Sequence, residues 1–165
     1  MMNRIYKILK IVFKNISTYF CIFYLTFQPV FAQTVANNAL PTNPNVTSGS
    51  ATFNQTTNQL TINQATDKLI TNWSSFNIGK DATVTFNQPS SLSSALNRVN
   101  SNDPSYIFGK LNANGQVILL NQSGVIFGNG AKFDAGSFIA STLNIKDTDF
   151  LNGKMIFEKD GFAGS

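Results

Sequence analysis

The chain has 165 residues, of which 12 are basic and 8 acidic, with one cysteine and no histidine. A single cysteine excludes an internal disulfide, and the lack of histidine excludes a Ser-His-Asp triad, a Cys-His pair and a His/Cys zinc site. No glycine-rich phosphate loop followed by lysine occurs. We therefore expect no catalytic residues, no cofactor and no metal site.

Residues 1–32 have the parts of a secretory signal peptide. Four basic residues and no acid precede an apolar core at 16–27, and Ala32 supplies a small residue before Gln33. The alternative is an uncleaved membrane anchor, but the apolar run is shorter than the ~18 residues that a spanning helix needs. We predict cleavage between Ala32 and Gln33, which leaves 33–165 as the mature domain.

Removal of the signal peptide changes the charge of the chain. The mature part keeps 8 basic and 8 acidic residues, so its formal net charge is zero. It therefore offers no basic patch for nucleic acid, and we expect no nucleic-acid partner.

Two segments of the mature chain alternate apolar and polar residues as strands do. They are 51–62, which should contain two strands, and 82–87. Between them lies the only tryptophan, Trp73, and we expect a bend just after it at Ser74-Ser75. Large aromatic side chains dominate core burial. The residues expected in the core here are Trp73, Phe76 and Phe86.

Two other segments suit helices. Residues 91–97 place apolar side chains at helical spacing, although an irregular connection is the alternative. Residues 146–153 resemble a helical turn that begins at an aspartate cap and ends at Gly153, and 154–158 resumes as a strand.

The stretch 111–144 alternates short apolar runs with Asn- and Gly-rich turns, which predicts many short strands. Val117–Leu120 does not alternate, so both of its faces should be buried. Asn121 and Gly124 suit the first and fourth positions of a type I turn, and Gly128 and Gly130 can adopt positive φ. The further core residues expected here are Val117, Leu119, Val125 and Phe127.

The dipeptide Asn114-Gly115 leaves two folds open. It is a strong hairpin signal, and read alone it would pair 107–111 with 116–120 as antiparallel strands. Alternatively, these segments are successive coils of a β-solenoid, in which Asn side chains form turns and stack between coils. The 19 Asn among the 133 mature residues suit this second possibility better.

The mature chain contains several short motifs in a fixed order: Leu40-Pro41-Thr42, Ser48-Gly49-Ser50-Ala51-Thr52, Trp73-Ser74-Ser75-Phe76-Asn77-Ile78-Gly79, Val84-Thr85-Phe86-Asn87-Gln88-Pro89, Leu96-Asn97-Arg98-Val99, Leu111-Asn112-Ala113-Asn114-Gly115-Gln116-Val117 and Ala140-Ser141-Thr142-Leu143. In this order they resemble the motifs of the N-terminal secretion domain of filamentous-haemagglutinin-like two-partner secretion exoproteins. One motif departs from the family: its usual Asn-Pro-Asn-Gly turn is replaced by Asn121-Gln122-Ser123-Gly124.

The resemblance implies an all-β fold, a right-handed parallel β-helix with N-terminal capping strands and a small extra-helical insertion. It places the secretion domain at 33–165. It also implies that the domain is truncated at its C-terminal end, as in a fragment or a degraded reading frame.

The resemblance also implies a function. Members are exported by the Sec machinery to the periplasm of a Gram-negative bacterium. An outer-membrane β-barrel transporter with periplasmic recognition domains then recognises them, and they reach the cell surface or the medium. They are large adhesins or haemagglutinins, whose N-terminal domain targets secretion and nucleates folding. The motif positions implied in transporter recognition are Asn97, Arg98, Asn121, Gln122, Ser123 and Gly124.

Two other functions deserve comparison with secretion targeting. A lectin-like module that binds surface glycans would use the many Ser, Thr and Asn side chains, but no motif localises such a site. A β-helix enzyme that degrades polysaccharides would need clustered carboxylates. The candidates are Asp134, Asp147 and Asp149, and a solvated loop explains the last two better.

Overall fold

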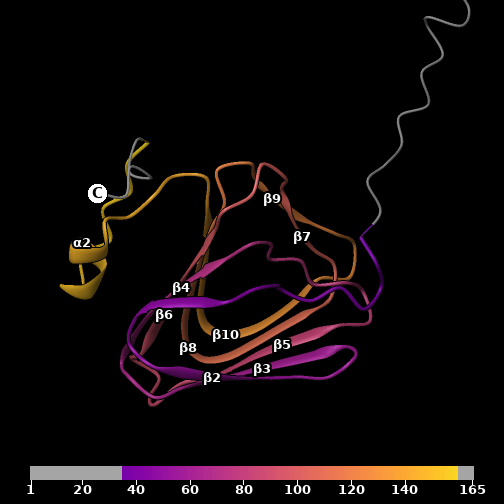
Figure 1. Cartoon of the computed structure of the whole chain (residues 1–165), viewed down its shortest axis with the longest axis horizontal. Helices are drawn as coiled ribbons and strands as arrows, with labels where there is room; N and C mark the ends of the chain where they lie inside the picture. Colours follow the sequence, from indigo (N-terminus) through magenta and orange to yellow (C-terminus); the bar gives the residue numbers. More distant parts are fainter. Residues whose placement is uncertain (1–34, 160–165) are drawn as a thin grey trace, which may run out of the picture. The chain divides into compact units, whose positions relative to one another are not determined.

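The computed structural model describes residues 35–159 (Figure 1). The predicted signal peptide, 1–32, and its cleavage site between Ala32 and Gln33 lie outside the described residues.

The described part of the chain is built almost entirely from strands. Its elements are β1 (Asn45–Ser48), β2 (Ala51–Gln55), β3 (Gln59–Gln64), β4 (Lys68–Trp73), β5 (Thr83–Asn87), β6 (Ser94–Val99), β7 (Ser105–Ile107), β8 (Lys110–Leu120), β9 (Val125–Phe127), β10 (Lys132–Ser141) and α2 (Asp147–Leu151).

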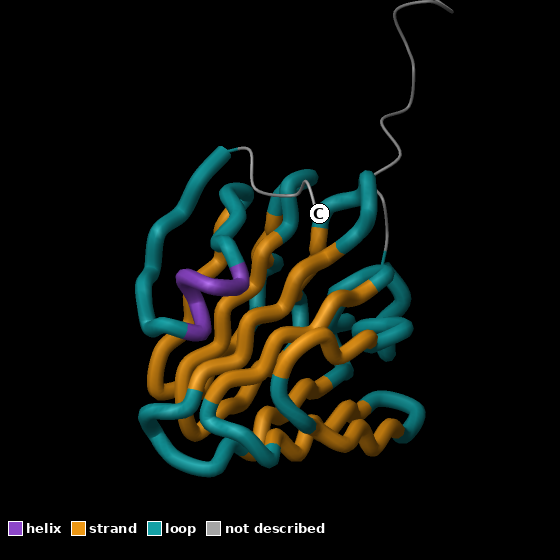
Figure 2. The backbone as a smooth tube through the Cα atoms, turned by 60° about the vertical axis from the view of Figure 1, so that its left-hand side comes forward, coloured by secondary structure: helices purple, strands orange, loops and turns teal. Residues whose placement is uncertain are grey.

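The strands stack in parallel as coils with three faces. On the first face, β3, β5 and the first halves of β8 and β10 lie in register. On the second, β4, β6 and the second halves of β8 and β10 do so, and Figure 2 shows these strands running side by side. The third face stacks Ile78 on β7, and β7 on β9. The predicted parallel β-helix is therefore confirmed.

The hairpin at Asn114-Gly115 is wrong, because β8 runs through this dipeptide and turns there from the first face to the second. Asn114 spans the backbone of Gln88: its Oδ1 accepts from the Gln88 amide at 2.7 Å, and its Nδ2 donates to the Gln88 carbonyl at 2.8 Å. A Cβ at Gly115 would lie 2.5 Å from the Ser93 carbonyl oxygen. The glycine is thus required by close packing at a corner.

Antiparallel strands close the N-terminal end of the coils. β1 pairs with β4, and β2 pairs with β3, so the first strand on each of these two faces has a partner on its outer edge. An unpaired strand edge invites association with other chains. These two strands confirm the predicted N-terminal cap.

The interior contains columns of apolar side chains, one from each coil. In one column Leu60, Val84 and Leu111 are in register and fully buried. Trp73 packs edge-on against Phe53 and Phe76, with ring centroids 5.7 and 5.5 Å apart. The predicted core residues that are buried are Trp73, Phe76, Phe86, Val117 and Leu119.

The other two predicted core residues lie at the last coil. Val125 is half-buried and packs against the core. Phe127 is 48% exposed, so its assignment to the core is wrong. Its column contains Ile78 and Ile107 beneath it, and no further coil covers it within residues 35–159.

The predicted helix at 91–97 is also wrong, because this segment enters β6, which is buried along its whole length. Leu92, one of the apolar residues whose spacing suggested the helix, is 88% exposed. Side chains on both faces of a strand can be apolar when both are covered, and a short apolar run then cannot be distinguished from a helix.

The helical turn at 146–153 is confirmed as α2, and Gly153 ends it with φ of 75°. Its cap differs from the prediction: the N-cap residue is Lys146, which makes no side-chain capping hydrogen bond. Residues 154–158 form no strand, and only Glu158 bridges back to Asn144. Residues 144–158, the outer segment from here on, lie outside the coils.

The predicted turn at Asn121 is confirmed by a hydrogen bond of 3.0 Å from the Gly124 amide to the Asn121 carbonyl. Gly124 and Gly130 both have φ of 109°, whereas Gly128 is not among the residues with positive φ. A Cβ at Gly128 would instead lie 2.1 Å from the Phe108 ring. This glycine is therefore required by packing.

Candidate functional site

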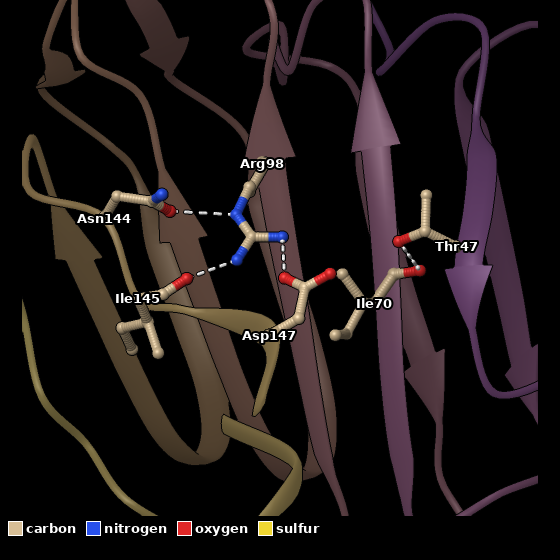
Figure 3. A network of polar contacts seen from close by, with 6 residues as sticks. All are labelled: Thr47, Ile70, Arg98, Asn144, Ile145 and Asp147. Atoms are coloured by element: carbon tan, nitrogen blue, oxygen red, sulfur yellow. Dashed lines mark hydrogen bonds and ion pairs between the residues drawn. The ribbon is translucent and has the colours of Figure 1, made fainter. Parts of the chain in front are cut away.

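Arg98 lies on the outward side of β6, where its guanidinium binds the outer segment (Figure 3). Its Nε donates to Asn144 Oδ1 at 2.9 Å, its Nη2 donates to the Ile145 carbonyl, and its Nη1 pairs with Asp147 Oδ1 at 2.5 Å. Arg98 is only 8% exposed. Its charge is thus satisfied within the domain, and Asp147 serves as its partner.

Beneath the outer segment, four aliphatic side chains form a continuous row on the outward side of the second face. We call this row the outer strip: Ile70, Leu96, Ile118 and Leu120. Ile145 and Phe150 cover the strip and are themselves fully buried. Lys68 Nζ lies 5.0 Å from the centroid of the Phe150 ring, within the range of a cation–π interaction. This cover explains why Leu96 in β6 and Ile118 and Leu120 in β8 are apolar on the outward side of the second face.

A second ion pair closes the outer segment on itself. Lys146 Nζ lies 3.0 Å from Glu158 Oε2, and backbone hydrogen bonds join Asn144 and Glu158 in both directions. The hydrogen bond to Glu158 and its charge raise the pKa of Lys146 above its ordinary value of 10.5. Both side chains are about half exposed, so the pair adds little to stability.

Asn97 points to the opposite side of β6, into the core. Its Oδ1 accepts from Trp73 Nε1 at 3.0 Å, and its Nδ2 lies 3.3 Å from the carbonyl oxygens of Ala95 and Ile118. Asn97 is fully buried. It therefore links the first coil, which carries Trp73, to the second and third.

Asn121 is fully buried at the corner between the second and third faces. Its Nδ2 donates to Ser105 Oγ at 2.9 Å and to the Asp103 carbonyl at 3.1 Å, while its Oδ1 accepts from the Ser123 amide at 2.9 Å. The side chain thus ties its own turn to the loop of the preceding coil.

The six motif residues therefore occupy different environments. Asn97 and Arg98 lie on opposite faces of one strand, and Asn121 is inside a corner. Ser123 and Gly124 are half-buried, and Ser123 Oγ donates to the Ser101 carbonyl at 3.1 Å. Gln122 alone is exposed, beside a hollow of 260 Å³ that Val99, Asn100, Ser101 and Asn102 also line.

Sequence reasoning missed Gln88, a buried side chain at the first corner. Its Oε1 accepts from the Gly115 amide at 2.9 Å, and its Nε2 lies 3.2 Å from the carbonyls of Ser93 and Gln116. A polar side chain next to a proline normally indicates a surface turn, so the sequence alone gives no signal for this role.

Within residues 35–159 there is no group of three or more acidic, His or Cys side chains that could hold a metal ion. No helix in the same range is long and apolar enough to cross a membrane. Asp134 and Asp149 lie on separate elements, β10 and α2.

The family profile that matches this chain is that of the TPS secretion domain, over residues 32–163. The chain belongs to the two-partner secretion (TPS) domain family. The crystal structure of the HMW1 secretion domain from Haemophilus influenzae is similar to this TPS domain, with a TM-score of 0.70 and 34% identity, over 75% of this chain and 33% of that one.

Two curated relatives are heme/hemopexin-binding proteins of Haemophilus influenzae. This chain is 43% identical to one, from strain Rd, and 42% to the other, in each case over 74 residues, 45% of this chain. The chain spans 8% of the length of each. A TPS domain is a non-catalytic targeting domain: it directs an exoprotein to its outer-membrane transporter for secretion across that membrane.

Proposed function

We propose that this chain directs a large surface adhesin through the periplasm of a Gram-negative bacterium to an outer-membrane β-barrel transporter. Residues 1–32 send it through the Sec machinery, with cleavage between Ala32 and Gln33. The observation that carries the proposal is the family match over 32–163 together with a β-helix whose N-terminal end is capped and whose last described coil, within residues 35–159, is not covered by another strand. The passenger is an adhesin that binds host or bacterial glycans.

The C-terminal end of the coils supports a role in nucleating folding. Phe127 and Phe133 are 48% and 40% exposed there, and they form a cluster with Phe138 in which the ring centroids are 4.7 to 6.2 Å apart. Among the described strands, β10 pairs only with β8. Further coils stacked on this end would bury the three rings and pair the free edge of β10, so each coil provides the template for the next.

Of the six motif residues, we propose that Gln122 is the one that the transporter contacts in the folded domain. In the folded domain Asn97, Arg98 and Asn121 act indirectly, because their polar groups bind other parts of the chain there. Gln122 and Ser123 stand where the family usually has Pro and Asn. The substituted turn retains its hydrogen bond and its buried Asn121, so the surface at Gln122 remains available.

The test is secretion by cells that carry this exoprotein and its transporter. Deletion of 33–165, with 1–32 kept, is expected to leave the exoprotein in the periplasm, as is loss of the transporter. The Gln122→Glu variant should be folded, by circular dichroism, and secreted more slowly, while Asn129→Asp on a neighbouring exposed turn should be secreted normally. Normal secretion of the deleted exoprotein would overturn the proposal, and normal secretion of Gln122→Glu would overturn the contact.

A further inference from the structure

In the sequence, all four residues of the outer strip precede the outer segment that covers them. These residues come from β4, β6 and β8, whereas the side chains that cover them lie after residue 143. A chain that is delivered from its N-terminus therefore forms the strip first. During that interval the strip is an apolar surface beside the charged Arg98, and contiguous apolar surface with a polar rim is typical of a protein interaction site.

The outer segment buries few apolar side chains of its own. α2 has five residues, and among its side chains only Phe150 is buried; Ile145 is the other buried apolar side chain of the cover. The segment contributes no strand to the coils, and one bridge joins its ends. Segments with few buried apolar contacts open more readily than the core.

The cover also shows what the strip accepts. Its two fully buried apolar side chains, the aliphatic Ile145 and the aromatic Phe150, contact the apolar row, and the half-buried Phe157 also packs against it. The outer segment also places the Asp147 carboxylate on the Arg98 guanidinium at 2.5 Å. Arg98 meets carboxylates with a planar set of donors. An external segment with two apolar side chains and one carboxylate at similar spacing would satisfy the same groups.

We propose that the outer strip, together with Arg98, is a transient docking surface for a periplasmic segment of the transporter, and that residues 144–158 displace this segment when the domain is complete. The inference rests on the proposed function. It gives Arg98 two successive carboxylate partners, first on the transporter and then Asp147. The transporter thus occupies the strip only while the domain is unfinished.

The test uses a variant in which the cover is detached, Ile145→Ser/Phe150→Ser, in the mature chain. Its matched control is Leu151→Ser, because Leu151 is the next residue of α2 and is 43% exposed. Two probes are measured: a synthetic peptide of residues 142–159, and the purified periplasmic domains of the transporter that secretes the exoprotein. Circular dichroism establishes that the coils of each variant are folded.

If the cover is open in ~1–10% of wild-type molecules, detaching it should raise the apparent affinity for both probes by about 10- to 100-fold. The Leu151→Ser control should bind like the wild type. Adding Ile118→Thr or Arg98→Gln to the detached variant should remove most of this gain, because they alter the strip and its charge. Equal binding of the transporter domains by wild type and detached variant would overturn the proposal and leave the proposed function intact.

Two other results are decisive. If the detached variant gains affinity for the peptide but not for the transporter domains, the strip is only an internal packing surface and the proposal fails. If neither form binds the transporter domains, and secretion is independent of the transporter, the proposed function fails as well.

Discussion

Replacement of Asn97 by alanine should destabilise the domain by about 2–4 kcal/mol. Asn97 Oδ1 is the acceptor for Trp73 Nε1 at 3.0 Å, and both residues are buried. Leaving a buried donor without a partner costs about 1–3 kcal/mol, and the cavity left by the removed side chain adds about 1 kcal/mol. Because Asn97 joins three coils, the loss should affect their unfolding together.

The assay is urea unfolding followed by circular dichroism. With a slope of about 2 kcal/mol per molar urea, the midpoint should fall by about 1–2 M. A double-mutant cycle with Trp73→Phe, which removes the donor but keeps a ring, should give a coupling of about 1 kcal/mol. A folded Asn97→Ala variant with an unchanged midpoint, yet with lost secretion, would refute this reasoning and make Asn97 a direct recognition residue.

Three further predictions concern other parts of the domain. Gly115→Ala should destabilise the domain more than Gly136→Ala, because the added Cβ would lie 2.5 Å from a backbone carbonyl oxygen at the first position and 3.1 Å at the second; equal urea midpoints would contradict this. Gln122→Pro should raise the Tm by about 1–4 °C, because proline suits the second position of a type I turn and restricts the unfolded chain; a lower Tm would show that the turn differs. The pKa of Lys146 is raised by Glu158, so the contribution of this pair is complete below the ordinary pKa of 10.5 and is lost as the pH rises through the higher folded pKa. The difference in Tm between wild type and Lys146→Gln should therefore be constant from about pH 7 to 9 and shrink as the pH rises above 10.5; a difference that shrinks below pH 9 would exclude this ion pair as its cause.

The turn residues and apolar runs are local signals, and they predicted a fold rich in short strands. The parallel arrangement of those strands was implied by the family resemblance. The sequence could not decide at Asn114-Gly115, since the same dipeptide suits a tight hairpin and a close-packed corner. The corner is stabilised by Gln88, 26 residues earlier, whose backbone amide and carbonyl both hydrogen-bond to the Asn114 side chain. A contact of that sequence separation leaves no local pattern.

The errors at 91–97 and at Phe127 also have non-local causes. Leu96 is apolar because the outer segment, almost 50 residues later in the chain, covers it. Together with Leu92 and Ala95 it therefore has the spacing of a helix although it lies in a strand. Phe127 is a large apolar residue and belongs to a core column, but it is the last residue of that column within the part of the chain that the structure describes and is 48% exposed. The apolar type of Phe127 predicted that it would join a core column. Its exposure depends on whether another coil is stacked on it, which the residue type does not reveal.

The family resemblance marks the motif residues that we propose for recognition, but their environments could not be predicted from the sequence. Asn97 and Arg98 are adjacent, and strand geometry places them on opposite faces. One then binds Trp73 in the core, and the other binds Asp147 outside it. A motif shared within a family can therefore reflect folding as much as contact with a partner.

The central claim is that the exported form of this domain is a stack of parallel coils. The most direct test is chemical cross-linking of Thr85→Cys/Asn112→Cys, two positions that are in register on adjacent coils, in molecules recovered from outside the cell. The only natural cysteine, Cys21, lies in the predicted signal peptide. We expect a short thiol cross-linker to join this pair in secreted molecules and to leave Thr85→Cys/Gln122→Cys unjoined. Secreted molecules in which neither pair, or both pairs equally, can be joined would contradict the stacked-coil account.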